Sequence, residues 1–177
     1  MALTSARIHT PAHPPISPMT FWKEFKSKSC SSRLKAADKE QALAEIVDLI
    51  VKGGELDSSL RDEALSALLA REQMASTGVG MNVAIPHVKL KGIDKVICSL
   101  CVSRTGLDWN SIDGDPVNIL FVVLRPERAT DSHDPEEHIE RMSWIARLSR
   151  EADFRRFVQK TNTKAEMLGL LKEMSAV

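Results

Sequence analysis

Residues 118–124, with the sequence NILFVVL, decide the fold class of this chain. Six of these seven residues are apolar, which is typical of a central strand that is buried on both faces of its sheet. A second strand is predicted over residues 96–103, where every second residue is apolar and lies on one face: Val96, Cys98, Leu100 and Val102. The sequence DGDP at residues 113–116 is typical of a tight turn between the two strands.

Helical patterns precede and follow the two strands. The first helix is predicted from Asp38, an N-cap with Gln41 three residues later, to the glycine pair at residues 53–54. Four more helices are predicted: one over about residues 59–71, one capped by Asp134, one over about residues 153–160 and one that begins at Thr163. We therefore expect a single α/β domain whose sheet is flanked by helices on both faces.

The first 20 residues differ in composition from the rest of the chain. They contain four prolines and few bulky apolar residues, so residues 1–20 are predicted to be a disordered tail and residues 21–177 the folded domain. A short amphipathic helical segment is expected around Phe21, Trp22 and Phe25, and a short strand at residues 30–35.

Charge and cysteine content exclude several classes of protein. The chain carries 24 basic and 24 acidic side chains, so it has no basic surplus for binding nucleic acid. No apolar run is long enough to span a bilayer, and the N-terminus lacks the apolar core of a signal peptide. Three cysteines, an odd number, argue against a disulfide framework. We therefore expect a cytoplasmic protein that neither inserts into a membrane nor binds nucleic acid.

The candidate chemistry is concentrated in residues 71–89, REQMASTGVGMNVAIPHVK. A short apolar strand is expected over residues 83–85 and is predicted to end at Pro86-His87. Proline fixes its own φ and biases the preceding residue toward an extended backbone, so His87 is carried on a stiff segment. Functional side chains often lie where a strand ends in this way.

The residues before this strand are suited to binding an anion. Arg71 has a permanent positive charge on a planar group that matches phosphate oxygens. Ser76 and Thr77 offer hydroxyl donors, and Gly78 lets its backbone approach a ligand closely. With His87 they predict an oxyanion pocket beside a nucleophilic imidazole. The run lacks the lysine of a P-loop, so by itself it is a weak signal.

A second histidine lies far along the chain, in the helix that Asp134 caps. Pro135 is at the first helical position, and His138 falls in the first turn on the same face as Met142 and Ile145. We therefore expect the His138 ring to point toward the sheet. The positive end of the helix dipole disfavours an imidazolium there and favours a bound anion.

Several motifs of the chain occur together in one known family: Arg71-Glu72, Ser76-Thr77-Gly78, Ala84-Ile85-Pro86-His87, Asp113-Gly114, the strand end from Phe121 to Pro126, and His138 at the head of its helix. In this combination the chain resembles the EIIA domain of the fructose/mannitol class of the bacterial phosphoenolpyruvate-dependent sugar phosphotransferase system. That class includes the nitrogen-regulatory EIIA proteins. The resemblance covers about residues 30–175.

The resemblance implies a mixed sheet flanked by helices and a phosphocarrier function. It assigns the phosphorylated histidine to His87, the second active-site histidine to His138 and the active-site arginine to Arg71. The donor would be an HPr-type phosphocarrier protein, and the acceptor an EIIB domain, unless the phosphorylation state regulates another protein. The lack of an attached EIIB or membrane segment favours the regulatory role. No metal or other cofactor is needed, because the phosphoryl group moves between histidine nitrogens.

Two alternative chemistries can be drawn from the sequence. A metal site can be drawn from His133, His138 and His87, although the spacing of the first two is unusual for ligands on one helix. His133 is otherwise expected to be an exposed loop residue. Cys98 and Cys101 suggest redox chemistry, but residues three apart in a strand point to opposite faces, so both are predicted to be packing residues.

The chain departs from the family pattern at two places next to the motif. Met81-Asn82 stands where the family commonly has a glycine, and Val88 follows His87 where a small residue is usual. Both places are expected to border the phosphohistidine and to affect the choice of partner.

Overall fold

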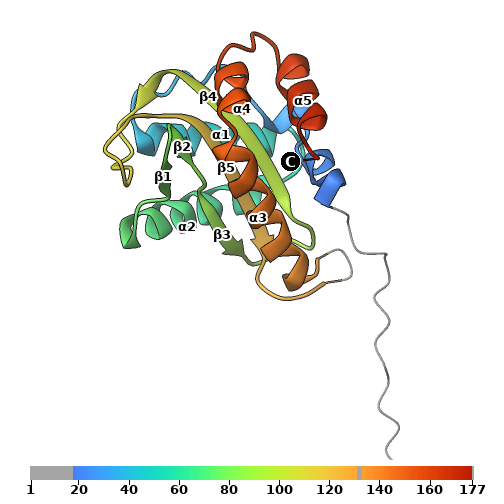
Figure 1. Ribbon diagram of the computed structural model, residues 1–177. Helices are drawn as coiled ribbons and strands as arrows, with labels where there is room; N and C mark the ends of the chain where they lie inside the picture. The colour runs from blue at the N-terminus through green and yellow to red at the C-terminus, as the bar shows by residue number, and fades with distance from the viewer. Residues whose placement is uncertain (1–17, 131–132, 177) are drawn as a thin grey trace, which may run out of the picture.

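Strand β5 (Val117–Pro126) is the centre of the sheet, as its apolar sequence predicts. In the computed structural model (Figure 1), β4 (Ile97–Leu107) pairs antiparallel with one side of β5. On the other side, β2 (Val83–Ala84) and β3 (His87–Leu90) pair parallel with it, and β1 (Gly78–Gly80) adds an antiparallel edge to β2. The expected mixed sheet is confirmed.

Strands β2 and β3 follow β5 in one continuous register. Val83 pairs with Ile119 and His87 with Val123, an offset of 36 positions in both cases. The ladder is interrupted between them, where Pro86 has no N–H to donate. Its carbonyl still accepts from Val123 N at 3.0 Å. The predicted end of the short strand before Pro86-His87 is confirmed, since β2 ends at Ala84. The sequence did not predict β3, which begins at His87 because the pairing resumes after the proline.

Helices cover both faces of the sheet (Figure 1). α1 (Lys39–Lys52) and α2 (Arg61–Met74) pack on one face, whereas α3 (Pro135–Arg150), α4 (Ala152–Val158) and α5 (Lys164–Glu173) pack on the other. The predicted arrangement of one sheet between two helical layers is confirmed.

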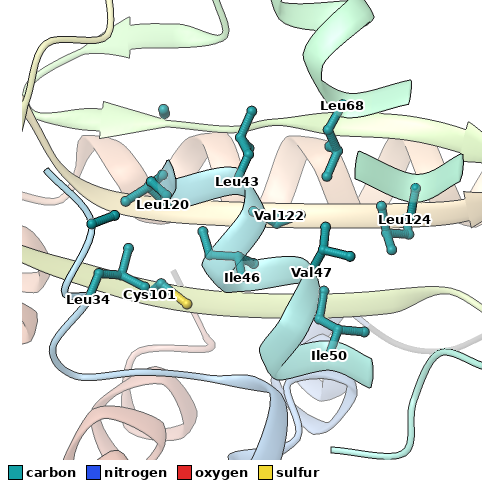
Figure 2. Packing of buried hydrophobic residues seen from close by; sticks show 14 of the residues in the cluster. Leu34, Leu43, Ile46, Val47, Ile50, Leu68, Cys101, Leu120, Val122 and Leu124 are labelled. Carbon is teal, nitrogen blue, oxygen red and sulfur yellow. The ribbon is translucent and has the colours of Figure 1, made fainter. Parts of the chain in front are cut away.

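Each face of the sheet has its own hydrophobic core. Figure 2 shows the core on the α1 face, where side chains of α1 meet alternate residues of β5: Leu43, Ile46, Val47, Leu120, Val122 and Leu124. The intervening β5 residues, including Phe121, point into the second core with Trp144 of α3. Cys98 lies in the second core and Cys101 in the first, as alternation predicts, and both thiols are free.

The helix ends follow the predicted capping signals. The Asp38 carboxylate accepts from Gln41 N at 2.7 Å. Thr163 and Glu166 form the expected capping box at the start of α5. α2 follows a 3₁₀ turn, η3 (Ser58–Leu60), and continues to Met74, three residues beyond its predicted end. Arg71 therefore lies within the last turn of α2.

The structure describes residues 18–130 and 133–176, so most of the predicted tail falls outside it. Pro18–Thr20 are the start of a 3₁₀ segment, η1 (Pro18–Glu24), which a second one follows, η2 (Ser27–Ser29). The strand expected at residues 30–35 is only a single bridge between Ser31 and Cys101, beside β4. No helix among the described residues is long and apolar enough to cross a membrane.

Candidate active site

The two histidines of the sequence prediction lie in one surface pocket of about 510 Å³, named here the His87 pocket. His87 and His138 are 51 positions apart in the sequence. Three segments supply the walls: the end of α2 with the loop and β1 after it, the β2–β3 segment, and the first turns of α3. The lining residues are Arg71, Ser76, Thr77, Val79, Ile85, His87, His138, Ile139, Met142, Ser143 and Ala146. The convergence predicted from the sequence motifs is therefore present.

The His87 ring is held in a defined tautomer by its own backbone. Its Nδ1 lies 2.8 Å from the carbonyl oxygen of Ile85. A carbonyl oxygen only accepts, so Nδ1 must carry the proton, and in the neutral ring Nε2 keeps its lone pair. Ile85 is two residues earlier, on the far side of Pro86, and the stiff backbone between them fixes the distance. Nε2 is thus the ring nitrogen of His87 whose lone pair is available to a ligand.

His138 is placed by the N-terminus of α3. The Asp134 side chain caps the helix by accepting from Glu136 N at 2.9 Å, and Pro135 follows at the first position. His138 is half-buried, and its Nδ1 is buried with no hydrogen-bond partner among the described residues. The pKa of His138 is lowered from 6.5 to about 4. Burial of the ring is the largest cause, and the charges of Arg125 and Arg141 add to it. The ring is therefore neutral at physiological pH.

Arg71 reaches the pocket from the last turn of α2. Its Nη1 donates to the carbonyl oxygen of Ala75 at 2.9 Å and so satisfies one of the open acceptors at the helix end. The guanidinium has five N–H donors, which leaves others for a ligand.

The loop residues after α2 are already engaged in hydrogen bonds. Ser76 Oγ donates to the carbonyl oxygen of Trp109 at 3.0 Å and accepts from Gly78 N at 3.1 Å. Thr77 Oγ1 donates to Glu72 and accepts from Trp109 Nε1. Ser76 and Thr77 line the pocket, whereas Gly78 does not. A Cβ at Gly78 would lie 2.3 Å from Ser111 Oγ, so close packing explains this glycine.

Glu72 is the residue whose importance the sequence did not reveal. It is only 7% exposed, and its carboxylate accepts from the backbone N–H and the hydroxyl of Thr77 and from Lys39 Nζ at 3.3 Å. Within the described part of the chain, Glu72 forms no hydrogen bond with Arg71. The Arg71-Glu72 motif includes this position, but an acidic residue near a helix end is usually solvent-exposed, so the motif does not predict the bonds to Thr77 and Lys39.

An apolar rim surrounds the two histidines. Val79 is 43% exposed and Ile139 is 68% exposed, and Met142 is half-buried between α3 and the pocket. The residues at the two departures from the family pattern do not border the pocket. Val88 packs into the core on the α1 face, and Met81 lies in the β1–β2 turn. The expectation that both places border the site at His87 is wrong, because strand alternation turns the Val88 side chain away and neither place contributes a lining residue.

His133 is buried and not the exposed loop residue that was expected. It is 3% exposed, and its backbone forms a bridge with Thr130. Burial and the charge of Arg141 lower its pKa. His133 is not a lining residue of the His87 pocket. No group of three or more potential metal ligands occurs among the described residues, so the metal-site alternative has no support.

Comparison with known proteins agrees with this architecture. Residues 24–174 match the family described as the phosphoenolpyruvate-dependent sugar phosphotransferase system, EIIA 2. The chain is 33% identical to a fructose-specific EIIA component of Haloferax volcanii, over 78% of this chain and 85% of that one. It is 37% identical to a nitrogen regulatory protein of Pseudomonas aeruginosa, over 66% of this chain and 71% of that one.

A solved complex shows the same fold. The structure of IIA mannitol with phosphorylated IIB mannitol from Escherichia coli aligns with a TM-score of 0.62 and 20% identity, and covers 84% of this chain and 97% of that one. Because the family match spans residues 24–174, this chain belongs to the EIIA 2 family of the phosphoenolpyruvate-dependent sugar phosphotransferase system.

Proposed function

We propose that this chain is a phosphocarrier that accepts a phosphoryl group on Nε2 of His87. The observation that carries the proposal is the His87 pocket, where an imidazole with a free Nε2 lone pair lies beside a second imidazole and a guanidinium. Phosphoryl transfer needs mainly in-line positioning and charge stabilisation from the protein, and these three side chains are suited to both.

In the proposed step, the Nε2 lone pair of His87 forms a bond to the phosphorus of a phosphohistidine on the donor. The P–N bond of the donor breaks, and its electron pair returns to the donor imidazole. Nδ1 keeps its proton through the bond to the Ile85 carbonyl, so the ring remains a good leaving group for onward transfer. Arg71 balances the phosphoryl charge, and His138 donates an N–H to one oxygen. No metal takes part.

The loop of Ser76, Thr77 and Gly78 has a second role in this proposal. The hydroxyl protons of Ser76 and Thr77 are committed to Trp109 and Glu72. They reach a phosphoryl oxygen only if these bonds are exchanged on binding. In the unphosphorylated state they hold the wall of the pocket in place.

The proposed partners are an HPr-type donor and either an EIIB acceptor or a regulatory target. The apolar rim of Val79, Ile139 and Met142 supports docking of a protein, because exposed apolar residues around a polar centre are typical of such surfaces. The proposal includes a cytoplasmic location, which three free buried thiols support.

Transfer of labelled phosphate from phosphoenolpyruvate, through Enzyme I and HPr, tests the proposal. We expect acid-labile label on the wild-type chain and none on His87→Gln. The matched control is His9→Gln, which removes a histidine to which the sequence assigns no role and should label normally. If the His87→Gln variant keeps its fold by circular dichroism and is still labelled as strongly as the wild-type chain, His87 is not the phosphorylated residue.

Onward transfer to EIIB separates the roles of the two histidines. We expect His138→Ala to accept label but to pass it to an EIIB roughly tenfold or more slowly, since one hydrogen bond to the moving group is lost. Normal onward transfer by His138→Ala would remove His138 from the mechanism. A wild-type chain that labels but transfers to no EIIB would favour the regulatory branch of the proposal.

A further inference from the structure

A buried ion pair ties the helix of His138 to the N-terminal segment of the domain. Arg141 is 1% exposed, and its Nε and Nη2 donate to Glu24 Oε2 and Oε1 at 2.5 Å and 2.7 Å. Glu24 ends η1, which packs against α3 and α5 and lies next to α5 in Figure 1. Arg141 follows His138 by three residues, so it lies one turn further along the same side of α3.

The surroundings of this Glu24–Arg141 pair are largely apolar. The guanidinium carbon of Arg141 lies 5.1 Å from the ring centroid of Phe21, and the thiol of Cys98 lies 3.5 Å from the Glu24 carboxylate. Arg141 Nη1 is buried with no hydrogen-bond partner among the described residues. A buried charge of this kind is costly to maintain, and apolar residues of similar size often replace such pairs without loss of stability. Its presence next to the active-site helix therefore suggests a role beyond packing.

Positive groups dominate the surroundings of His138. Arg125, on β5, is on the face of the sheet that α3 covers, because the preceding alternate residues Phe121 and Val123 lie in that core. The charged and titratable groups near His138 come from every element around it: Arg71 of α2, His87 of β3, Arg125 of β5, His133 before α3, Glu137 and Arg141 of α3, and Glu24 of η1.

We propose that Glu24 and Arg141 are positioning residues of the His87 pocket, which hold the first turns of α3 and keep the His138 ring uncharged. Burial of the ring and the charge of Arg125 contribute most to its neutrality. Glu24 cancels part of the Arg141 charge, and the remainder adds to their effect against protonation of His138. The effect of this pair on phosphoryl transfer rests on the proposed phosphocarrier function. The protonation of His138 can be measured without it.

An uncharged His138 suits a carrier that must release what it binds. A neutral N–H orients the phosphoryl group through an ordinary hydrogen bond. An imidazolium would make a charge-assisted bond of about twice the strength and would stabilise the bound state more than the transfer. The Glu24–Arg141 pair therefore adjusts the pocket from a distance, without touching the phosphoryl group.

Titration of His138 by NMR in the full-length unphosphorylated chain tests the inference. Arg141→Gln removes the positive charge and leaves the Glu24 carboxylate, so the His138 midpoint should rise by roughly one pH unit. Glu24→Gln leaves Arg141 uncompensated, so the midpoint should stay at or below the wild-type value. Both variants break the same ion pair. If the pair only held α3 in place, its loss would expose the His138 ring in both variants, and both midpoints would rise toward the ordinary value near 6.5.

Two further variants keep the test decisive if a single variant loosens the fold. The double variant Glu24→Gln with Arg141→Gln restores a neutral hydrogen-bonding pair, and its midpoint should lie between those of the single variants. Arg147→Gln removes an exposed arginine of the same helix and should leave the midpoint unchanged. An unchanged midpoint in Arg141→Gln, or a raised one in Glu24→Gln, overturns the inference.

The consequence for transfer is measured separately at pH 5, where a midpoint raised by about one pH unit from about 4 leaves roughly half of His138 protonated. We expect Arg141→Gln to accept label normally and to pass it on about twofold more slowly than the wild-type chain at the same pH. Unchanged onward transfer in a variant with a raised midpoint overturns the consequence. If no variant and no wild-type protein accepts label, the phosphocarrier proposal fails, whereas the titrations still decide the role of the pair.

Discussion

Glu72 shows how much a single buried side chain contributes to the shape of the pocket. Its carboxylate receives the backbone N–H of Thr77 at 3.1 Å and the Thr77 hydroxyl, and Trp109 Nε1 donates to that hydroxyl at 3.1 Å. Lys39 of α1 supplies the neutralising charge. One acid thus joins α1, the end of α2 and the loop that forms a wall of the pocket.

Replacement of this carboxylate should be costly. Glu72→Gln keeps one acceptor oxygen but leaves Lys39 Nζ without its charged partner. Its amide group also faces the N–H of Thr77. We therefore expect the free energy of unfolding to fall by about 2–4 kcal/mol. Urea denaturation measures this change. Glu63→Gln, on the exposed side of the same helix, is the control and should change stability by less than about 0.5 kcal/mol. Equal effects of the two substitutions would contradict the role given to Glu72.

At the scale of an element, the β1–β2 hairpin carries conformational strain close to the pocket. Met81 and Asn82 occupy its turn with φ of 56° and 63°, the left-handed region that glycine adopts without penalty. The Asp113 carboxylate braces the turn by accepting from Met81 N at 2.8 Å. A glycine at either position would adopt this geometry without the steric cost of a Cβ.

Relief of this strain should stabilise the protein. Met81→Gly removes a Cβ that is unfavourable at positive φ, and after the entropy cost of glycine we expect a gain of about 0.5–1 kcal/mol. Chemical denaturation again supplies the measurement. Asn82→Gly is the matched comparison, because it loses the donation from the Asn82 amide to the Pro116 carbonyl at 2.8 Å and should give no gain. A Met81→Gly protein less stable than Asn82→Gly would show that the turn is not strained.

On the scale of the whole molecule, the N-terminal segment is part of the second core. Phe21 of η1 is fully buried, with its ring centroid 6.0 Å from that of Trp144 on α3. Phe25 lies 6.0 Å from Phe121 of β5 in an edge-to-face arrangement. Segments from the two ends of the described chain and from its middle strand therefore close one core, which favours a single cooperative transition.

Truncation of Phe21 tests this arrangement. We expect Phe21→Ala to lower the free energy of unfolding by about 3–5 kcal/mol, because a buried aromatic side chain leaves a cavity among residues from three elements. Phe157→Ala, at a site that is 46% exposed, should cost clearly less. Calorimetry on both variants compares them, and similar midpoints would mean that η1 contributes little to the core.

Much of this architecture is predictable from local patterns. The apolar run of β5, the alternation in β4 and the caps at Asp38 and Thr163 all depend on neighbours within a few residues, and each was predicted correctly. The start of β3 at His87, the burial of His133 and the function of Glu72 were not. They depend on which distant segment lies alongside: β5 extends the pairing beyond Pro86, and the fold encloses both acidic and imidazole side chains that usually face water.

The sequence by itself determined the type and order of the elements and the residues that carry the candidate chemistry, because backbone propensity, capping and hydrophobic period are local properties. Only the tertiary structure decided that His87 presents Nε2 to the pocket, that Ser76 and Thr77 are already hydrogen-bonded, and that Glu24 reaches the helix of His138. These features arise from contacts between segments far apart in the chain, and such contacts form only when burial of both faces of one sheet brings the segments together.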